Sequence, residues 1–316
     1  MRRRALLGVS VAGALALAGC RTYRSSAPVA TPALPSGGGP VPFTPGKIKL
    51  GAYVDLKGLS ETDALGLRRR QLGRAERIVH RYYSWTDRLP TTLSYVPPDS
   101  TLMVSWRGPH YSVINGGSAD QLVAAAARQL KARAQPTLLR WGWDMNRDFY
   151  AWGGPANQND TSGYVRAWRR LREIFAKEGA DNVSWVWSPN WNSHPDLAWN
   201  TAAHYYPGDE YVDWAGVSGY AEDQAPGDLF ENFYDTYAST KPIMLTEVAV
   251  VDRGGASKPQ WISSLRDWVK QRPAVGAVVW FDTDTHPGST EKWRVDSTPA
   301  SLAAYRAMSD DPAFRG

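Results

Sequence analysis

The sequence predicts a single (β/α)8 barrel, an α/β fold in which eight parallel strands alternate with helices. Short runs of β-branched and aromatic residues alternate with helix-like segments from Lys47 onward, and this pattern favours parallel strands joined by helical crossovers. Eight such runs fit in about 270 residues, the usual length of one barrel. No change of composition divides residues 47–316, so we expect one domain.

The predicted strands share a short, mostly apolar core bounded by turn-forming residues. They are expected at residues 48–54, 78–84, 101–107, 137–143, 183–188, 212–218, 242–248 and 275–281. Helices are expected between them, among others at 118–134, 162–178 and 258–271. In the first helix four apolar residues recur at helical spacing, namely Leu122, Val123, Ala126 and Leu130.

The N-terminus has the features of a bacterial export signal. Three arginines at positions 2–4 precede an apolar stretch, residues 5–18, that is too short to span a membrane permanently. The stretch ends in Leu-Ala-Gly-Cys, which resembles a lipobox, where the signal is removed before a lipidated cysteine. We therefore expect residues 1–19 to be a signal peptide and Cys20 to carry a lipid that anchors the protein outside the cytoplasm. An ordinary cleaved signal is the alternative.

Residues 20–46 are rich in Pro, Gly, Ser and Ala and contain few large apolar side chains. Such a segment cannot bury a core of its own and behaves as a flexible linker. We expect it to tether the domain 47–316 to the membrane without packing against the barrel.

Charge and cysteine content exclude several classes of partner. The net charge of +5 includes three arginines of the predicted signal, which leaves 33 basic against 31 acidic residues and no basic block. Nucleic acid is therefore not an expected partner. Cys20 is the only cysteine, so intramolecular disulfides and cysteine-based zinc sites are excluded. The five histidines show no metal-ligand spacing, and we expect no metal, no cofactor and a monomer.

Two carboxylates are expected at one end of the barrel. Catalytic residues of this fold lie at the carboxyl ends of the strands, and Asp144 and Glu247 follow or end the fourth and seventh predicted strands. Trp and Tyr residues surround both positions, and fifteen of each occur in the chain. Such rings either pack in the core or stack on sugars. Paired carboxylates among aromatic rings are typical of glycoside hydrolysis.

Several longer segments resemble a known family. They are Leu139–Asn146 (LRWGWDMN) followed by Trp152-Gly153, Val183–Asn190 (VSWVWSPN), Tyr206–Asp213 (YPGDEYVD), Lys241–Glu247 (KPIMLTE) and Val278–Phe281 (VVWF). On these residues the chain resembles glycoside hydrolase family 26, best known for β-1,4-mannanases that are retaining (β/α)8 enzymes. The resemblance covers most of residues 47–308.

The resemblance implies an endo-acting, retaining β-glycanase whose partner is a polysaccharide. Glu247 falls at the family's nucleophile and Asp144 at its acid/base, while Tyr220 falls at the tyrosine that hydrogen-bonds the nucleophile. Trp152 lies near the aromatic ring that frames the sugar site. The substrate-binding residues that we expect are Tyr220, Trp152, Trp143, Asn146 and Trp280. Arg140, within a strand, is expected to brace a neighbouring carboxylate.

The chain departs from the family pattern at the acid/base. The family usually has His-Glu where this chain has Trp143-Asp144, and the aspartate carboxyl lies about 1.5 Å closer to the backbone than that of a glutamate. Asp148 is an alternative acid. The departure leaves a second hypothesis open, in which the lipoprotein binds a cell-surface polymer for export or remodelling without cutting it.

Overall fold

The computed structural model of the protein describes residues 34–286 and 293–316, which fall in one compact unit, 33–316. Cys20, the predicted signal peptide 1–19 and the first part of the predicted tether lie outside the described residues. No helix within 34–286 and 293–316 combines the length and the apolar character that crossing a membrane requires.

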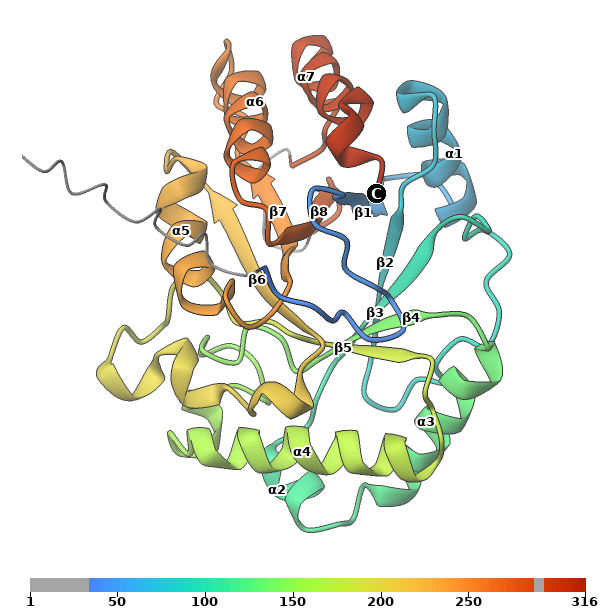
Figure 1. Ribbon diagram of the computed structural model, residues 1–316, viewed down its shortest axis with the longest axis vertical. Helices are drawn as coiled ribbons and strands as arrows, with labels where there is room; N and C mark the ends of the chain where they lie inside the picture. Colours follow the sequence, from blue (N-terminus) through green and yellow to red (C-terminus); the bar gives the residue numbers. More distant parts are fainter. Residues whose placement is uncertain (1–33, 287–292) are drawn as a thin grey trace, which may run out of the picture. The chain divides into compact units, whose positions relative to one another are not determined.

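Eight parallel strands close into a barrel in sequence order, with β1 paired to β8 (Figure 1). The strands are β1 (Lys49–Asp55), β2 (Ile78–Tyr83), β3 (Thr101–Trp106), β4 (Thr137–Trp141), β5 (Val183–Trp187), β6 (Trp214–Ala221), β7 (Ile243–Val250) and β8 (Val275–Thr283). All eight predicted strands are confirmed, with ends displaced by a few residues. The fold class predicted from the sequence is therefore correct.

Helices cover the outside of the barrel, as Figure 1 shows. They are α1 (Glu61–Leu72), α2 (Tyr111–Asn115), α3 (Asp120–Arg133), α4 (Thr161–Lys177), α5 (Pro226–Tyr237), α6 (Ser257–Lys270) and α7 (Pro299–Asp310). The three predicted helices correspond to α3, α4 and α6. Two connections depart from strict alternation, because residues 84–100 after β2 contain no helix and the β5–β6 connection contains only short 3-10 turns.

Helix α4 illustrates how the local sequence fixes an element. The Asp160 side chain accepts a hydrogen bond from the Gly163 N–H at 2.9 Å, which caps the first turn and is worth about 1 kcal/mol. One face of the helix is buried against the strands and consists of Tyr164, Ala167, Trp168, Leu171 and Phe175. The helix therefore covers the β4–β5 side of the barrel and leaves its polar face to solvent.

The inside of the barrel is layered along its axis. The lower layer is an apolar cluster of Val41, Ile78, Met103, Leu138, Val186, Trp214, Met244, Ala277 and Val279. Above it, towards the carboxyl ends of the strands, the inward side chains become polar, and the uppermost ones are aromatic or acidic. This order places the chemistry-bearing groups at the end of the barrel where the fold class predicts them.

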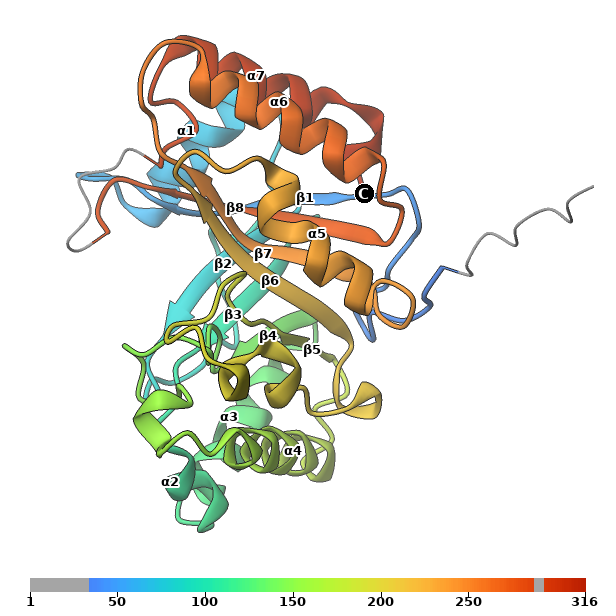
Figure 2. The ribbon, with the colours of Figure 1, turned by 90° about the vertical axis from the view of Figure 1, so that its left-hand side faces the viewer.

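Residues 38–43 close the opposite end of the barrel, so the expectation that the whole tether is free of the domain is wrong. Val41 is buried in the lower apolar cluster, and its N–H donates to Ser184 Oγ at 2.8 Å. Trp214 Nε1 donates to the Gly38 carbonyl at 3.0 Å, and the Phe43 ring packs edge-on against Trp214. Figure 2 shows this segment at the end away from the arrowheads of the strands. We call residues 38–43 the plug.

Sequence composition missed the plug because its apolar residues are isolated. Only Val41 and Phe43 are large, and neither belongs to a periodic run. Phe43 packs where β8 has a glycine instead of a larger residue. A Cβ at Gly276 would lie 2.6 Å from Phe43 and 2.8 Å from Trp214.

Candidate active site

Glu247 reaches the barrel interior because β7 is irregular at this point. Along β6 and β7, Val217 pairs with Leu245 but Ser218 pairs with Glu247, so the pairing skips Thr246. An extra residue of this kind shifts the alternation of side chains beyond it. Thr246 and Glu247 therefore both point inward, although they are neighbours in sequence.

Both carboxylate oxygens of Glu247 are hydrogen-bonded by residues of other strands. Oε1 accepts from the Tyr82 hydroxyl at 2.5 Å and from Arg140 Nη1, and Oε2 accepts from the Tyr220 hydroxyl. The strands β2, β4 and β6 thus fix one carboxylate from three sides. The contacts predicted for Tyr220 and for Arg140 are both present.

Asp144 lies beside the same guanidinium, just after β4. Its carboxylate is 3.6 Å from Arg140 Nη2 and accepts a hydrogen bond from Asn190 Nδ2 at 3.3 Å. The backbone of Asp144 is left-handed, with φ of 51°, a region in which Asn and Asp are strongly enriched among non-glycine residues. Its N–H donates to the Ser188 carbonyl at 2.9 Å, which ties this strained turn to the end of β5.

A layer of polar side chains crosses the barrel beneath the two carboxylates and holds Arg140 in place. The hydrogen bonds of this layer run between Arg140 Nη1 and Ser105 Oγ (3.3 Å), Arg140 Nη2 and Ser218 Oγ (2.6 Å), His80 Nε2 and Ser105 Oγ (2.7 Å), and Ser188 Oγ and Thr246 Oγ1 (2.7 Å). Burial lowers the pKa of His80 far below its ordinary value, and Arg140 and Arg81 lower it further. The imidazole is therefore neutral and adds no second positive charge.

One buried cation, Arg140, lies beside two buried carboxylates and contacts them unequally. Arg140 is inaccessible to solvent, and Asp144 and Glu247 are each 3% exposed. Glu247 makes the closer contact with the guanidinium. Burial raises the pKa of Asp144 to about 6, and the charge of Glu247 contributes to the rise while Arg140 opposes it. A buried carboxyl group whose pKa is raised in this way is suited to act as the acid of such a pair.

Trp143, Trp152 and Asn146 are buried around the two carboxylates, and their contact with substrate stays a prediction. Trp143 and Trp152 are 2% and 3% exposed, and Trp152 Nε1 donates to the Trp143 carbonyl at 2.6 Å. The Tyr150 ring stacks on Trp152 with centroids 4.4 Å apart. Asn146 is 1% exposed and links the turn after β4 to Asn190 in both directions, at 2.9 Å each.

The prediction that Trp280 binds substrate is wrong. Its ring is fully buried between the barrel and the helices, where it packs edge-on against Trp261 and Tyr305. Inward and outward side chains alternate along β8, so its neighbour Phe281 faces the barrel mouth instead and packs against Tyr53 and Tyr220.

Trp293, after β8, lies beside Tyr220 at the barrel mouth, where Trp280 was expected to lie. Its half-buried ring lies 5.2 Å from Tyr220 and 5.3 Å from Phe281, measured between centroids. Its indole Nε1 is buried and has no hydrogen-bond partner within the described residues. Sequence reasoning also missed Tyr82, although its even spacing from Ile78 and His80 on β2 places all three on one face.

Asp148, the alternative acid, is exposed and pairs with His194 at 3.3 Å rather than with Arg140, the partner of Asp144 and Glu247. In 34–286 and 293–316, no group of three or more His, Cys, Asp and Glu side chains is arranged to hold a metal ion. The residues that meet at the barrel mouth are therefore Asp144, Glu247, Arg140, Tyr82 and Tyr220.

The chain is similar to several known proteins. Endoglucanase H of Acetivibrio thermocellus is 31% identical over 284 residues, which cover 82% of this chain and 30% of that protein. A mannan endo-1,4-β-mannosidase of Bacillus subtilis is 29% identical over 140 residues, which cover 42% of this chain and 36% of that protein. A β-1,3-xylanase of a Vibrio species is 28% identical over 156 residues, covering 48% and 31%. The chain thus spans about a third of the length of these curated relatives.

Solved structures share the fold at lower sequence identity. A mannanase of Bacillus subtilis aligns with a TM-score of 0.60 at 18% identity, covering 83% of this chain and 85% of that one. A family 26 β-mannanase of Bacteroides ovatus aligns with a TM-score of 0.59 at 18% identity, covering 85% and 90%. The profile of glycosyl hydrolase family 26 matches residues 94–296, from the loop before β3 to the segment after β8. With that match over most of the barrel, the chain belongs to glycosyl hydrolase family 26.

Proposed function

We propose that the protein is an endo-acting β-glycanase that hydrolyses a β-linked polysaccharide with retention of configuration. The observation that carries the proposal is the Arg140 guanidinium shared by Asp144 and Glu247, with the pKa of Asp144 raised to about 6. Relatives named as an endoglucanase, a mannan endo-1,4-β-mannosidase and a β-1,3-xylanase support an endo-acting enzyme for a β-linked main chain.

In the first step, a Glu247 oxygen attacks the anomeric carbon and forms a glycosyl ester as the glycosidic C–O bond breaks. Asp144 gives its proton to the departing oxygen. In the second step, water attacks the same carbon, Asp144 takes the water proton, and Glu247 leaves as a carboxylate. Tyr82, Tyr220 and Arg140 orient the Glu247 carboxylate for the attack.

The substrate-binding surface that we propose is aromatic. The half-buried Trp293 ring flanks Tyr220, and its face can stack on a sugar ring. Mannan is the substrate that we favour, since the family to which the chain belongs is best known for β-1,4-mannanases and such enzymes are among the matched proteins.

The first prediction concerns substrate and stereochemistry. Incubation with galactomannan, glucomannan, mixed-linkage β-glucan and β-1,3-xylan should release oligosaccharides from at least one polymer, with mannan cleaved fastest. Proton NMR during the first minutes should show the β-anomer forming first, because two inversions at one carbon restore its configuration. An α-anomer appearing first would disprove retention.

A second candidate function is polysaccharide binding without cleavage, which is favoured by the short Asp144 side chain. Electrophoresis through gels that contain the same polymers separates the two. Retardation by a polymer that is never shortened would support the binding protein, whereas cleavage of that polymer would exclude it.

We also propose that the protein is a lipoprotein anchored outside the cytoplasm through Cys20, on the basis of the lipobox-like residues before it. The second prediction is that Cys20→Ser abolishes incorporation of labelled fatty acid and removes the protein from the membrane fraction or stalls its processing. Wild-type protein expressed in parallel is the control. Equal labelling and fractionation of the two proteins would exclude lipidation at this residue.

A further inference from the structure

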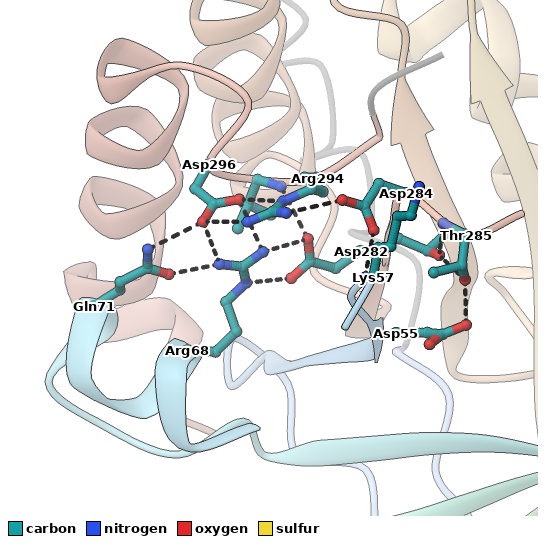
Figure 3. Close-up of polar contacts among 11 residues, drawn as sticks. Asp55, Lys57, Arg68, Gln71, Asp282, Asp284, Thr285, Arg294 and Asp296 are labelled. Carbon is teal, nitrogen blue, oxygen red and sulfur yellow. Dashed lines mark hydrogen bonds and ion pairs between the residues drawn. The ribbon is translucent and has the colours of Figure 1, made fainter. Parts of the chain in front are cut away.

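A network of charged side chains joins α1 to the two ends of the β8–α7 connection (Figure 3). We call it the charge clamp; its members are Arg68, Asp282, Asp284, Arg294 and Asp296. Asp282 and Asp284 lie at the end of β8, Arg294 and Asp296 lie before α7, and Arg68 comes from α1.

Arg68 is the centre of the clamp. It is 1% exposed and donates to Asp282 Oδ1 at 2.9 Å and to Asp296 at 2.7 and 3.0 Å. Arg294 donates to Asp296 at 2.8 and 3.1 Å and to Asp284 Oδ2 at 2.9 Å. Each arginine therefore connects the segment that leaves β8 to the segment that enters α7.

The clamp holds residues 293–296 together with two neighbouring side chains, Lys258 and Trp280. The Val295 N–H donates to Asp282 Oδ1 at 3.0 Å, Lys258 Nζ donates to the Arg294 carbonyl at 2.7 Å, and Trp280 Nε1 donates to the Trp293 carbonyl at 2.8 Å. With the side chain of Asp296, four successive residues are held by groups from α1, α6 and β8. Each of these four residues is thus held by a hydrogen bond to its backbone or side chain, whereas connecting segments on a protein surface are usually more mobile.

The segment held in this way carries the Trp293 ring. That ring lies against Tyr220, whose hydroxyl donates to Glu247. A continuous path of contacts thus runs from α1 on the outside of the barrel to the carboxylate at its mouth.

Stability alone does not account for such a network. Burying Arg68 and Asp282 removes two charges from water, and a buried ion pair is often no more stabilising than apolar residues of the same size. Burial alone would raise the pKa of Asp296, but hydrogen bonds from Arg294, Arg68 and Gln71 outweigh it and hold the pKa below its ordinary value. The carboxylate therefore stays charged, and its bidentate contacts with both arginines give directional restraint.

We propose that the charge clamp is a positioning device that fixes Trp293 as the substrate-binding ring, so that substrate affinity depends on Arg68 and Asp296, neither of which contacts the sugar. The substrate-binding part of this inference rests on the proposed function. The positioning of Trp293 can be tested without it.

The third prediction concerns Asp296→Ala, which removes hydrogen bonds from Arg68, Arg294 and Gln71 at once. Amide hydrogen exchange in a peptide covering residues 293–298 should become at least tenfold faster. Asp213→Ala is the matched control, because Asp213 also pairs with an arginine, Arg172 at 3.0 Å, but lies at the start of β6 on the plugged end. In that variant the exchange of residues 293–298 should be unchanged.

On a cleaved polymer, Asp296→Ala should raise KM about tenfold and lower kcat less, whereas Asp213→Ala should change neither. Trp293→Ala should raise KM as well. If the clamp acts through Trp293, the double variant should have the KM of Trp293→Ala alone, since two changes on one path are not additive.

Unchanged exchange of residues 293–298 in Asp296→Ala, or KM effects of the two changes that multiply, would overturn the inference. Failure of wild-type protein to cleave or bind any polymer is a different result. It would refute the proposed function, while the exchange measurement would still decide whether the clamp positions Trp293.

Discussion

Glu247→Gln should lower turnover on any cleaved polymer by about 10⁴-fold or more, because it removes the charge that attacks the anomeric carbon. The amide has nearly the shape of the carboxylate. However, it offers one acceptor oxygen where Tyr82, Arg140 and Tyr220 supply three donors. Steady-state kinetics on the preferred polymer, with circular dichroism to verify folding, measures the effect.

Glu222→Gln is the matched control for this substitution. Glu222 follows β6 on the same side of the barrel, its side chain is 73% exposed, and it pairs with Arg253. The same chemical change there should leave turnover within about twofold, as for most surface substitutions. Turnover of Glu247→Gln within tenfold of wild type would show that Glu247 is not the nucleophile.

Asp144→Asn should lower turnover on polysaccharides by about 10²- to 10³-fold, which is typical of losing a general acid. The effect should be small on aryl glycosides with a good leaving group, whose departing oxygen needs no proton. Because Asp144 must be protonated to act as the acid, and its pKa is about 6, wild-type activity should fall as the pH rises through that value. The alkaline fall should disappear in the asparagine variant.

Two further substitutions test the length of the Asp144 side chain and the role of the Asp148 carboxylate. Asp144→Glu should retain or increase activity on mannan, because the longer side chain extends the carboxyl by about 1.5 Å. It should also lower the melting temperature, since glutamate tolerates the left-handed backbone at this position less well than aspartate. Asp148→Asn should leave the pH profile unchanged. An alkaline fall that persists in Asp144→Asn would assign the acid to another group.

The sequence predicted the strands well because buried parallel strands are continuous apolar runs with clear ends. It also located Asp144 and Glu247, since both lie at the carboxyl ends of strands. The facing of individual side chains was less predictable. Trp280 and Phe281 are adjacent aromatic residues, and only the observed alternation along β8 shows that the second one faces the barrel mouth.

The remaining part of the site depends on irregularities that no periodic pattern contains. The skipped pairing at Thr246 brings Glu247 into line with Ser218, and the left-handed turn at Asp144 directs its carboxyl towards Arg140. Tyr82 reaches Glu247 because closure of the barrel brings the ends of β2 and β7 to the same mouth. Tyr82 and Glu247 are 165 positions apart in the chain, so no local sequence pattern relates one to the other.

The plug also constrains the order in which the chain folds. Val41 is hydrogen-bonded to Ser184, 143 residues later, and its carbonyl accepts from Trp214, 173 residues later. The plug is synthesised before the barrel but cannot dock until β5 and β6 exist. Docking of the plug therefore has to follow the formation of β5 and β6, and it joins the N-terminal end of the domain to the second half of the barrel.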